Sequence, residues 1–180
     1  MSEKKFLIVV DMQKDFIDGS LGTKEARAIV PAAAARIRSC REAGYTVIAT
    51  MDTHEANYPD TQEGRLLPVP HCIRGTEGWQ LDERIRAEAA DCPAVIKNTF
   101  GSVRLPRIIG ELTEQDDQIT IGLIGLCTDI CVVSNALLLK ANFPEALIWV
   151  DPACCAGVTP QKHEAALMTM ESCQISLRPS

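Results

Sequence analysis

Short, almost continuously apolar segments alternate along the chain with longer segments rich in Ala, Leu and Glu. Strands that are apolar on both faces belong in a sheet that helices cover on both sides, whereas half-exposed strands alternate apolar and polar residues. Alternation of such strands with helices is typical of a parallel sheet with right-handed crossovers. The pattern therefore predicts a three-layer α/β domain that extends over residues 1–180.

Six strands and five helices are predicted from this pattern. The strands are 6–11, 46–51, 94–97, 118–125, 146–150 and 174–177. The helices are 31–43, 78–90, 105–112, 129–141 and 159–171. We place Pro31 at the first helical position and Thr159 as an N-cap before Pro160, because these residue types are favoured at helix starts.

Charge and composition exclude several classes of function. The 24 acidic residues outnumber the 18 Lys and Arg, and the resulting net charge of −6 disfavours binding to nucleic acids or to anionic membrane surfaces. No apolar run reaches the ~20 residues of a membrane-spanning helix, and the N-terminal segment does not resemble a signal peptide. We therefore expect a cytoplasmic protein whose eight cysteines are thiols.

Charged and nucleophilic side chains follow three of the predicted strands. Asp11 and Lys97 end their strands, and Cys131 lies where the fourth strand passes into a helix. Ligands bind at the carboxyl ends of strands in open α/β sheets, so we expect these three residues to meet on adjacent strand ends. The helix start and Lys97 would lower the pKa of the Cys131 thiol, and Asp11 could take its proton. The backbone N–H groups of Cys127 and Cys131 could form an oxyanion hole.

The alternative is structural. A cytosolic cysteine is most often a small core residue, a strand-end acid is often solvated, and a lone lysine usually lies at the surface. The predicted meeting of Asp11, Lys97 and Cys131 favours the catalytic interpretation.

Residues 52–79 show no clear periodicity, although the segment contains Trp79 and several aliphatic residues. A long irregular segment in a compact domain is usually functional or disordered. It carries Asp52, His54, Glu63 and His71, a mixed nitrogen and oxygen set that suits Zn²⁺, Mn²⁺ or Fe²⁺. The alternative is that these side chains only make hydrogen bonds within the loop.

Five motifs resemble, in order, those of the isochorismatase-like cysteine hydrolases, and most closely the nicotinamidase branch. They are VDMQKDF at 10–16, DTH at 52–54, PHCIRGT at 70–76, KNTFGS at 97–102 and GLCTDICV at 125–132. The resemblance covers nearly the whole chain.

The resemblance implies a six-stranded parallel sheet, an Asp11–Lys97–Cys131 triad and a cis peptide between Leu126 and Cys127. It implies a divalent metal, with zinc the first choice, and dimers or tetramers of the chain. It also implies two further sets of residues: Phe16, Leu126 and Phe100 for the substrate, and Asp52, His54, Glu63 and His71 for the metal.

One departure from the family pattern concerns the substrate. Nicotinamidases clamp the pyridine ring between two aromatic residues, and Phe16 matches only the first. Leu67, Pro68 and Val69 stand where the second is expected, so Phe100, Tyr58 or a partner subunit would have to supply that wall.

Three functions follow in order of preference. The first is metal-assisted hydrolysis of a small carboxamide, with nicotinamide converted to nicotinate and ammonia. The second is an N-carbamoyl or ureido amidohydrolase without a catalytic metal, and the third is a non-catalytic binding protein with the same fold. Isochorismate hydrolysis is disfavoured, because family members that perform it lack the nucleophilic cysteine.

Overall fold

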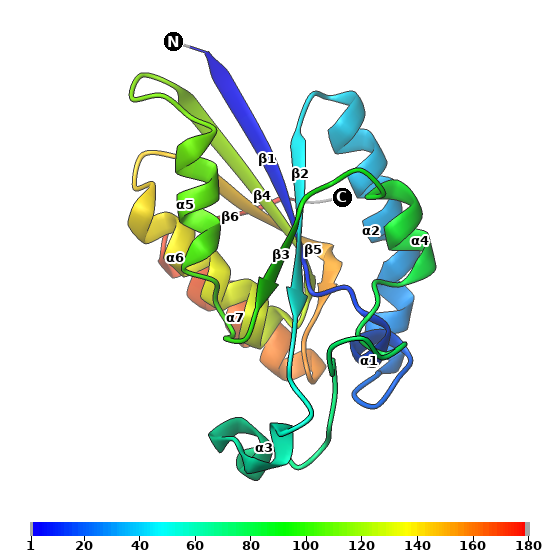
Figure 1. Ribbon diagram of the computed structural model, residues 1–180. Helices are drawn as coiled ribbons and strands as arrows, with labels where there is room; N and C mark the ends of the chain where they lie inside the picture. Colours follow the sequence, from blue (N-terminus) through cyan, green and yellow to red (C-terminus); the bar gives the residue numbers. More distant parts are fainter. Residues whose placement is uncertain (1, 179–180) are drawn as a thin grey trace.

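The structure is a computed structural model that describes residues 2–178. Its centre is a six-stranded, all-parallel sheet, as the resemblance implied (Figure 1). The strand order is β3-β2-β1-β4-β5-β6. The strands are β1 (Glu3–Val10), β2 (Thr46–Asp52), β3 (Ala94–Lys97), β4 (Gln118–Leu126), β5 (Leu147–Ala156) and β6 (Ser176–Leu177).

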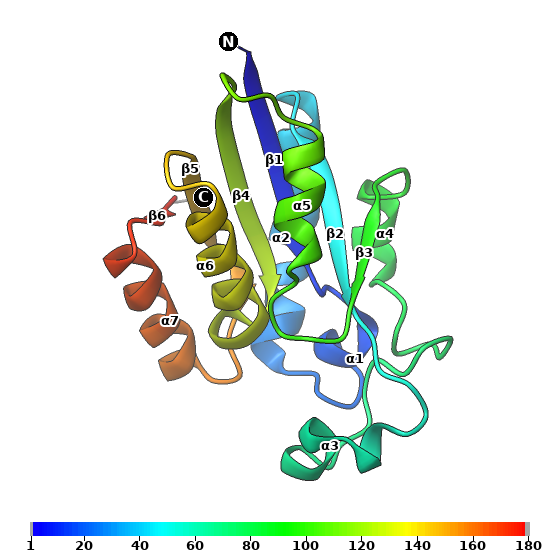
Figure 2. The ribbon, with the colours of Figure 1, turned by 60° about the vertical axis from the view of Figure 1, so that its left-hand side comes forward.

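Helices cover both faces of the sheet, so the three-layer prediction is confirmed. Side chains of α1 (Lys14–Ile17), α2 (Lys24–Glu42) and α4 (Glu83–Glu88) pack on one face. Helices α5 (Arg104–Glu111), α6 (Val133–Asn142) and α7 (Pro160–Ser172) cover the other face (Figure 2). Their apolar side chains belong to the core on that face.

The central strand shows why the predicted strands read as unbroken apolar runs. Phe6, Ile8 and Val10 of β1 belong to the core beneath α5, α6 and α7, whereas Leu7 and Val9 belong to the core beneath α2. All five side chains are buried, since both faces of the strand are covered.

The prediction that Pro31 begins a helix was wrong. Helix α2 begins at Lys24, and the side chain of Thr23 caps it by accepting a hydrogen bond from the amide of Ala26 at 3.0 Å. Pro31 lies inside this helix with its ring exposed. The burial of Ala26, Ile29 and Val30 extends the apolar face of the helix N-terminally past the proline.

Other boundaries also differ. The helix predicted over 78–90 is confined to Glu83–Glu88, where Asp82 caps it, and β5 continues past Val150 to Ala156. The segment 52–79 contains a 3₁₀ turn (Tyr58–Asp60) and α3 (Gln62–Leu66), which the sequence did not predict. It lies beyond the carboxyl ends of the strands (Figure 1).

Within residues 2–178, no helix has the length and apolar character needed to span a membrane.

Candidate functional site

Asp11, Lys97 and Cys131 meet at the carboxyl edge of the sheet, although they are distant along the chain. The ammonium nitrogen Nζ of Lys97 lies 2.6 Å from Oδ2 of Asp11 and 3.4 Å from Sγ of Cys131. All three residues are buried. The predicted convergence of an acid, a cation and a thiol is therefore present.

The three strand ends are not adjacent, which corrects one part of the prediction. Strand β2 lies between β1 and β3, so the Lys97 side chain crosses the end of β2 to reach Asp11. Asp52 is the last residue of β2, and its Oδ1 lies 3.4 Å from Nζ of Lys97. Lys97 thus links the triad to the neighbouring carboxylate.

Asp11 is held in place by β2. Its backbone has a positive φ of 49°, and its amide donates to the carbonyl of Thr50 at 3.2 Å. The hydroxyl of Thr50 donates to Oδ1 of Asp11 at 2.6 Å. Oδ2 is thereby left to face Lys97, because the other carboxylate oxygen is engaged.

Burial decides the protonation of the thiol, contrary to the expected stabilised thiolate. It raises the pKa of Cys131 well above its ordinary value, and the nearby negative charge of Asp11 adds to this, while the charge of Lys97 only partly offsets both. Burial also raises the pKa of Asp11 against the opposing effect of Lys97. Cys131 therefore rests as a thiol beside a carboxyl group of heightened basicity.

The turn that carries Cys131 is a single π-helical turn, Thr128–Val132, between β4 and α6. The predicted cis peptide between Leu126 and Cys127 is present. The amides of Ile130 and Val132 both donate to the carbonyl of Cys127 at 3.1 Å. Asn135 donates to the carbonyl of Cys131 at 2.8 Å, so α6 fixes the position of the cysteine.

The entry to this turn requires glycine. Gly125 has φ +122°, and a Cβ atom there would lie 2.1 Å from the carbonyl oxygen of Val10. Strands β1 and β4 can approach closely only because this position has no side chain.

A second cluster lies beside the triad, formed by residues that were predicted as metal ligands. Nε2 of His54 is 3.1 Å and Nε2 of His71 is 3.6 Å from Oδ2 of Asp52. Donor atoms of these three buried residues all lie within 4.8 Å of one another. Oε1 of Glu63 lies 3.6 Å from His54 Nε2 and 3.8 Å from His71 Nε2, so the fourth candidate borders the cluster.

The arrangement of this cluster suits a divalent cation. Nδ1 of His71 lies 2.8 Å from the carbonyl of Val69, which can only accept, so Nδ1 carries a proton and Nε2 is the ring nitrogen that faces Asp52 and would bind a metal in place of its own proton. Burial raises the pKa of Asp52, but hydrogen bonds from His54 and His71 and the charge of Lys97 outweigh it and hold the pKa well below its usual range. Two imidazoles and one carboxylate, with Glu63 at hand, are a ligand set that fits zinc.

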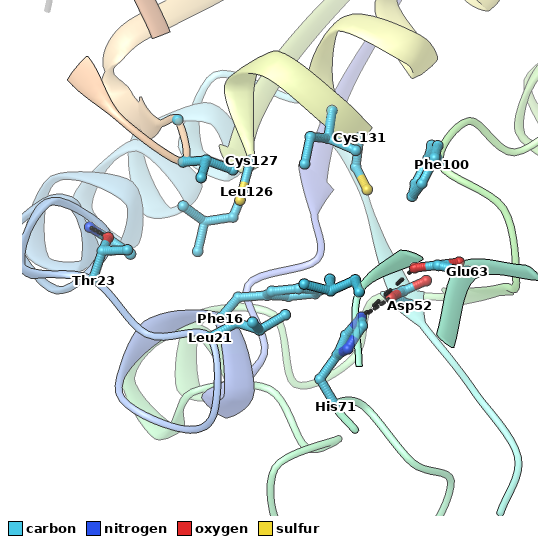
Figure 3. A pocket seen from close by; sticks show the side chains of 15 residues that line it. Phe16, Leu21, Thr23, Asp52, Glu63, His71, Phe100, Leu126, Cys127 and Cys131 are labelled. Carbon is cyan, nitrogen blue, oxygen red and sulfur yellow. Dashed lines mark hydrogen bonds and ion pairs between the residues drawn. The ribbon is translucent and has the colours of Figure 1, made fainter. Parts of the chain in front are cut away.

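A cavity of about 150 Å³ joins the two clusters. Cys131 and Cys127 line it on one side, and Asp52, Glu63 and His71 line it on the other (Figure 3). Its walls are otherwise mostly apolar, with the larger side chains from Phe16, Leu21, Leu67, Phe100, Leu126 and Ile130.

The cavity is lined by each residue that was expected to contact the substrate: Phe16, Leu126 and Phe100. Of the side chains considered for the missing second aromatic wall, Phe100 lines the cavity and is half exposed, at 51%. Tyr58 does not; its buried ring packs behind the cluster, 4.6 Å from the ring of His54. Leu67 lines the cavity at the place where the resemblance implied an aromatic residue.

Gln13 and Thr50 were given no role in the sequence analysis. Thr50 fixes Asp11, as described above, and Gln13 is fully buried and bonds to the backbone of Asp52. Gln13 lies in the first of the five motifs, two residues after Asp11, and that position was the one available signal.

The fold and the site together define a three-layer α/β protein with an Asp–Lys–Cys cluster and an Asp–His–His cluster at one sheet edge. The chain belongs to the isochorismatase family, because the model of the isochorismatase domain matches residues 5–178. Among curated relatives, the nicotinamidase of Escherichia coli K12 is 28% identical over 92% of this chain and 89% of its own length. A probable inactive nicotinamidase of Arabidopsis thaliana is 26% identical over 92% of this chain and 87% of its own length.

Solved structures repeat the likeness. The nicotinamidase/pyrazinamidase PncA of Bacillus subtilis has a TM-score of 0.81 and 29% identity, and covers 97% of this chain and 98% of its own. The pyrazinamidase of Pyrococcus horikoshii in complex with zinc has a TM-score of 0.81 and 26% identity, covering 98% and 99%. The N-carbamoylsarcosine amidase of Thermoplasma acidophilum has a TM-score of 0.79 and 28% identity, covering 98% and 96%.

Proposed function

We propose that the protein is a metal-assisted cysteine amidohydrolase that cleaves a small carboxamide through a thioester, with nicotinamide as the first candidate substrate. The observation that carries the proposal is the contact of one ammonium group, that of Lys97, with both the Asp11 carboxylate and the Cys131 sulfur. A base and a counter-charge are thereby collected around a nucleophile that lines the cavity.

The first half of the reaction begins with the neutral thiol. As Sγ of Cys131 attacks the amide carbon, its proton passes to Asp11, whose raised pKa suits it to accept one. Lys97 keeps its proton, since the charges of Asp11 and Asp52 oppose the effect of burial and its pKa is raised. Its positive charge stabilises the negative charge that develops as the sulfur loses its proton. The attack converts the carbonyl oxygen to an oxyanion. When the C–N bond breaks, Asp11 returns its proton to the leaving nitrogen, which departs as ammonia.

The second half regenerates the thiol. Asp11, again a carboxylate, takes a proton from a water molecule that attacks the thioester carbon. The C–S bond then breaks, and the sulfur regains a proton as the carboxylic acid leaves.

The backbone N–H groups of Cys127 and Cys131 are proposed to hold the oxyanion. Both residues line the cavity, and one such donor is typically worth ~3 kcal/mol of barrier.

Asp52, His54 and His71 would hold the metal, and Glu63 borders them as the fourth candidate ligand. Bound there, the ion would supply a Lewis-acid site for the pyridine nitrogen and so orient the ring. Phe16 and Leu126 would pack against that ring, because both line the cavity.

A second candidate is an N-carbamoyl or ureido amidohydrolase, which the likeness to N-carbamoylsarcosine amidase supports. It keeps the triad but needs no metal. The experiment that separates the candidates is an ammonia-release screen over nicotinamide, pyrazinamide and N-carbamoyl amino acids, with and without a chelator. Release from nicotinamide that the chelator abolishes and zinc restores supports the first candidate. Chelator-insensitive release from a carbamoyl compound supports the second.

Substitution of the nucleophile tests the division of labour between the clusters. Cys131→Ala should abolish ammonia release and leave the zinc content unchanged, since the sulfur belongs to the triad and not to the metal cluster. Cys173→Ala is the matched control, because Cys173 is a partly buried cysteine at the C-terminal end of α7 that does not line the cavity. Normal turnover by the Cys131→Ala variant would refute Cys131 as the nucleophile. Absence of ammonia release from every compound by the unaltered protein would instead favour a non-catalytic role, and one relative is a probable inactive nicotinamidase.

A further inference from the structure

A second, larger hollow lies beside the catalytic cavity. The inner cavity measures about 150 Å³, whereas the outer hollow measures about 460 Å³. Glu63, Leu67, Phe100 and Ile130 line both, so these four side chains form the boundary between the two spaces. We call the outer space the α3 groove, which is also lined by Gln62, Leu66, Asn98 and Thr99.

The inner cavity limits what part of a substrate it can hold. A cavity of ~150 Å³ in a protein core accommodates one benzene-sized ring. The ring of a pyridine carboxamide would fill it between Phe16, Leu126 and the metal-ligand cluster (Figure 3). A larger substituent on that ring must therefore extend into the α3 groove.

The surface of the α3 groove is mostly apolar and lacks positive charge. Leu66 is 79% exposed and Leu67 is 38% exposed, and with Phe100 they give the groove an apolar surface that is open to solvent. Among the residues within 2–178 that line the groove, none is Lys, Arg or His, and Glu63 is the single charged one. An anionic substituent would be repelled there, whereas an alkyl or aryl group would cover the exposed leucines.

The departure at Leu67 explains why the groove is open. Leu67 stands where the family resemblance implies an aromatic wall, and its smaller side chain forms only part of the boundary between the two spaces. Phe100 forms another part from the loop between β3 and α5, on the same side of the cavity as Cys131 (Figure 3).

We infer that this enzyme takes carboxamides that carry an uncharged apolar substituent, with the ring in the inner cavity and the substituent in the α3 groove between Leu66, Leu67 and Phe100. The inference rests on the proposed amidohydrolase function for its chemistry, but the groove itself can be tested without turnover.

The binding experiment uses the Cys131→Ala variant loaded with zinc, and compares nicotinamide with 5-butylnicotinamide and 6-butylnicotinamide by calorimetry. The two isomers direct the chain from neighbouring ring positions. At least one of them should bind about tenfold more tightly than nicotinamide, because about two methylene groups would be transferred out of water onto the leucine side chains. Equal or weaker binding of both isomers would overturn the inference.

A substitution in the groove localises the effect. With Leu66→Asp added to the Cys131→Ala protein, the preference for the butyl derivative over nicotinamide should fall at least fivefold, because the chain would then lie against a carboxylate. Met168→Asp is the matched control, since Met168 is 66% exposed on α7 and lines neither space. An unchanged preference in the Leu66→Asp protein would also overturn the inference.

Turnover by the otherwise unaltered enzyme then separates the two proposals. Faster ammonia release from the preferred butyl derivative than from nicotinamide, compared as kcat/KM, supports both. A binding preference without ammonia release from either compound would refute the amidohydrolase function and leave the apolar subsite in place.

Discussion

The side-chain amide of Gln13 brackets the backbone of Asp52. Its Oε1 accepts a hydrogen bond from the Asp52 amide at 2.7 Å, and its Nε2 donates to the Asp52 carbonyl at 2.8 Å. The same Nε2 donates to the carbonyl of Trp79, also at 2.8 Å. One buried side chain thus joins the end of β1 to the end of β2 and to the far end of the segment 52–79, and so fixes the carboxylate around which the histidines gather.

Replacement of Gln13 by Leu should therefore weaken both folding and metal binding. The change leaves the N–H and carbonyl groups of Asp52 buried without partners, which we expect to lower the free energy of unfolding by about 2–4 kcal/mol. Loss of support behind a ligand typically lowers metal affinity ~10–100-fold. Urea unfolding and competition with a zinc chelator measure the two effects.

Gln118→Leu provides the control for this change, because Gln118 is exposed at the start of β4 and should alter stability by less than about 0.5 kcal/mol. A Gln13→Leu protein with full zinc affinity would show that the bracket does not position Asp52.

Lys97 is the cation that separates two buried carboxylates, so its removal should make stability depend on pH. In a Lys97→Met protein, Asp11 loses the charge that lowers its pKa, and burial and Asp52 raise that pKa further above the unfolded value. A folded pKa above the unfolded one stabilises the protein at acidic pH, and this contribution is lost as pH rises through the folded pKa. The destabilisation should reach about 3–5 kcal/mol near pH 8 and be markedly smaller near pH 5.

Urea unfolding of the wild-type and Lys97→Met proteins at the two pH values measures this difference. Lys5→Met is the control, because Lys5 forms its ion pair with the exposed Glu3, and its removal should show little dependence on pH. An equal loss of stability at both pH values would contradict this prediction, because it would mean that the charge of Asp11 remains balanced without Lys97.

The triad could be predicted because each member follows a strand whose apolar pattern is clear. Asp11 and Lys97 end runs of buried residues, and Cys131 follows another, so the parallel sheet brings all three to one edge. The same reasoning could not give the strand order, because nothing in the local pattern near Lys97 shows that β2 lies between β3 and β1.

Two other features depend on tertiary contacts that a linear pattern does not contain. The sequence predicts that a lysine lies near Cys131, but it does not predict how deeply Cys131 is buried. That burial is what raises the pKa of the thiol. The role of Gln13 depends on both ends of its amide meeting the backbone of a residue 39 positions away.

The helix start predicted at Pro31 was wrong because an exposed proline is tolerated inside α2, whose buried face continues on both sides of it.

The metal cluster should respond unequally to loss of its members. Nε2 of His71 lies with the donor atoms of Asp52 and His54 in the tight buried group, whereas Glu63 borders that group at 3.6 Å or more and is partly exposed. His71→Ala should therefore abolish stoichiometric zinc binding, and Glu63→Gln should lower the affinity only about tenfold. Zinc analysis after dialysis and chelator competition provide the measurement. Loss of equal size in both variants would make Glu63 a full ligand.

Asp11→Asn should have opposite effects on turnover and on alkylation of Cys131. The charge of Asp11 raises the pKa of the thiol and that of Lys97 lowers it, so removal of the carboxylate leaves the lysine less opposed and shifts the pKa of Cys131 downward. Because the thiolate is the form that reacts, iodoacetamide should modify Cys131 several-fold faster at pH 8 in the variant. Amide hydrolysis should nevertheless fall by at least ~10²-fold, since no group remains to carry the proton from the sulfur to the leaving nitrogen.

Peptide mapping by mass spectrometry measures the modification of Cys131 and, in the same sample, of the partly exposed Cys92, whose rate of modification should not change. Slower modification of Cys131 in the Asp11→Asn protein would show that the carboxylate activates the thiol in the resting state, and would contradict the order of proton transfer proposed above.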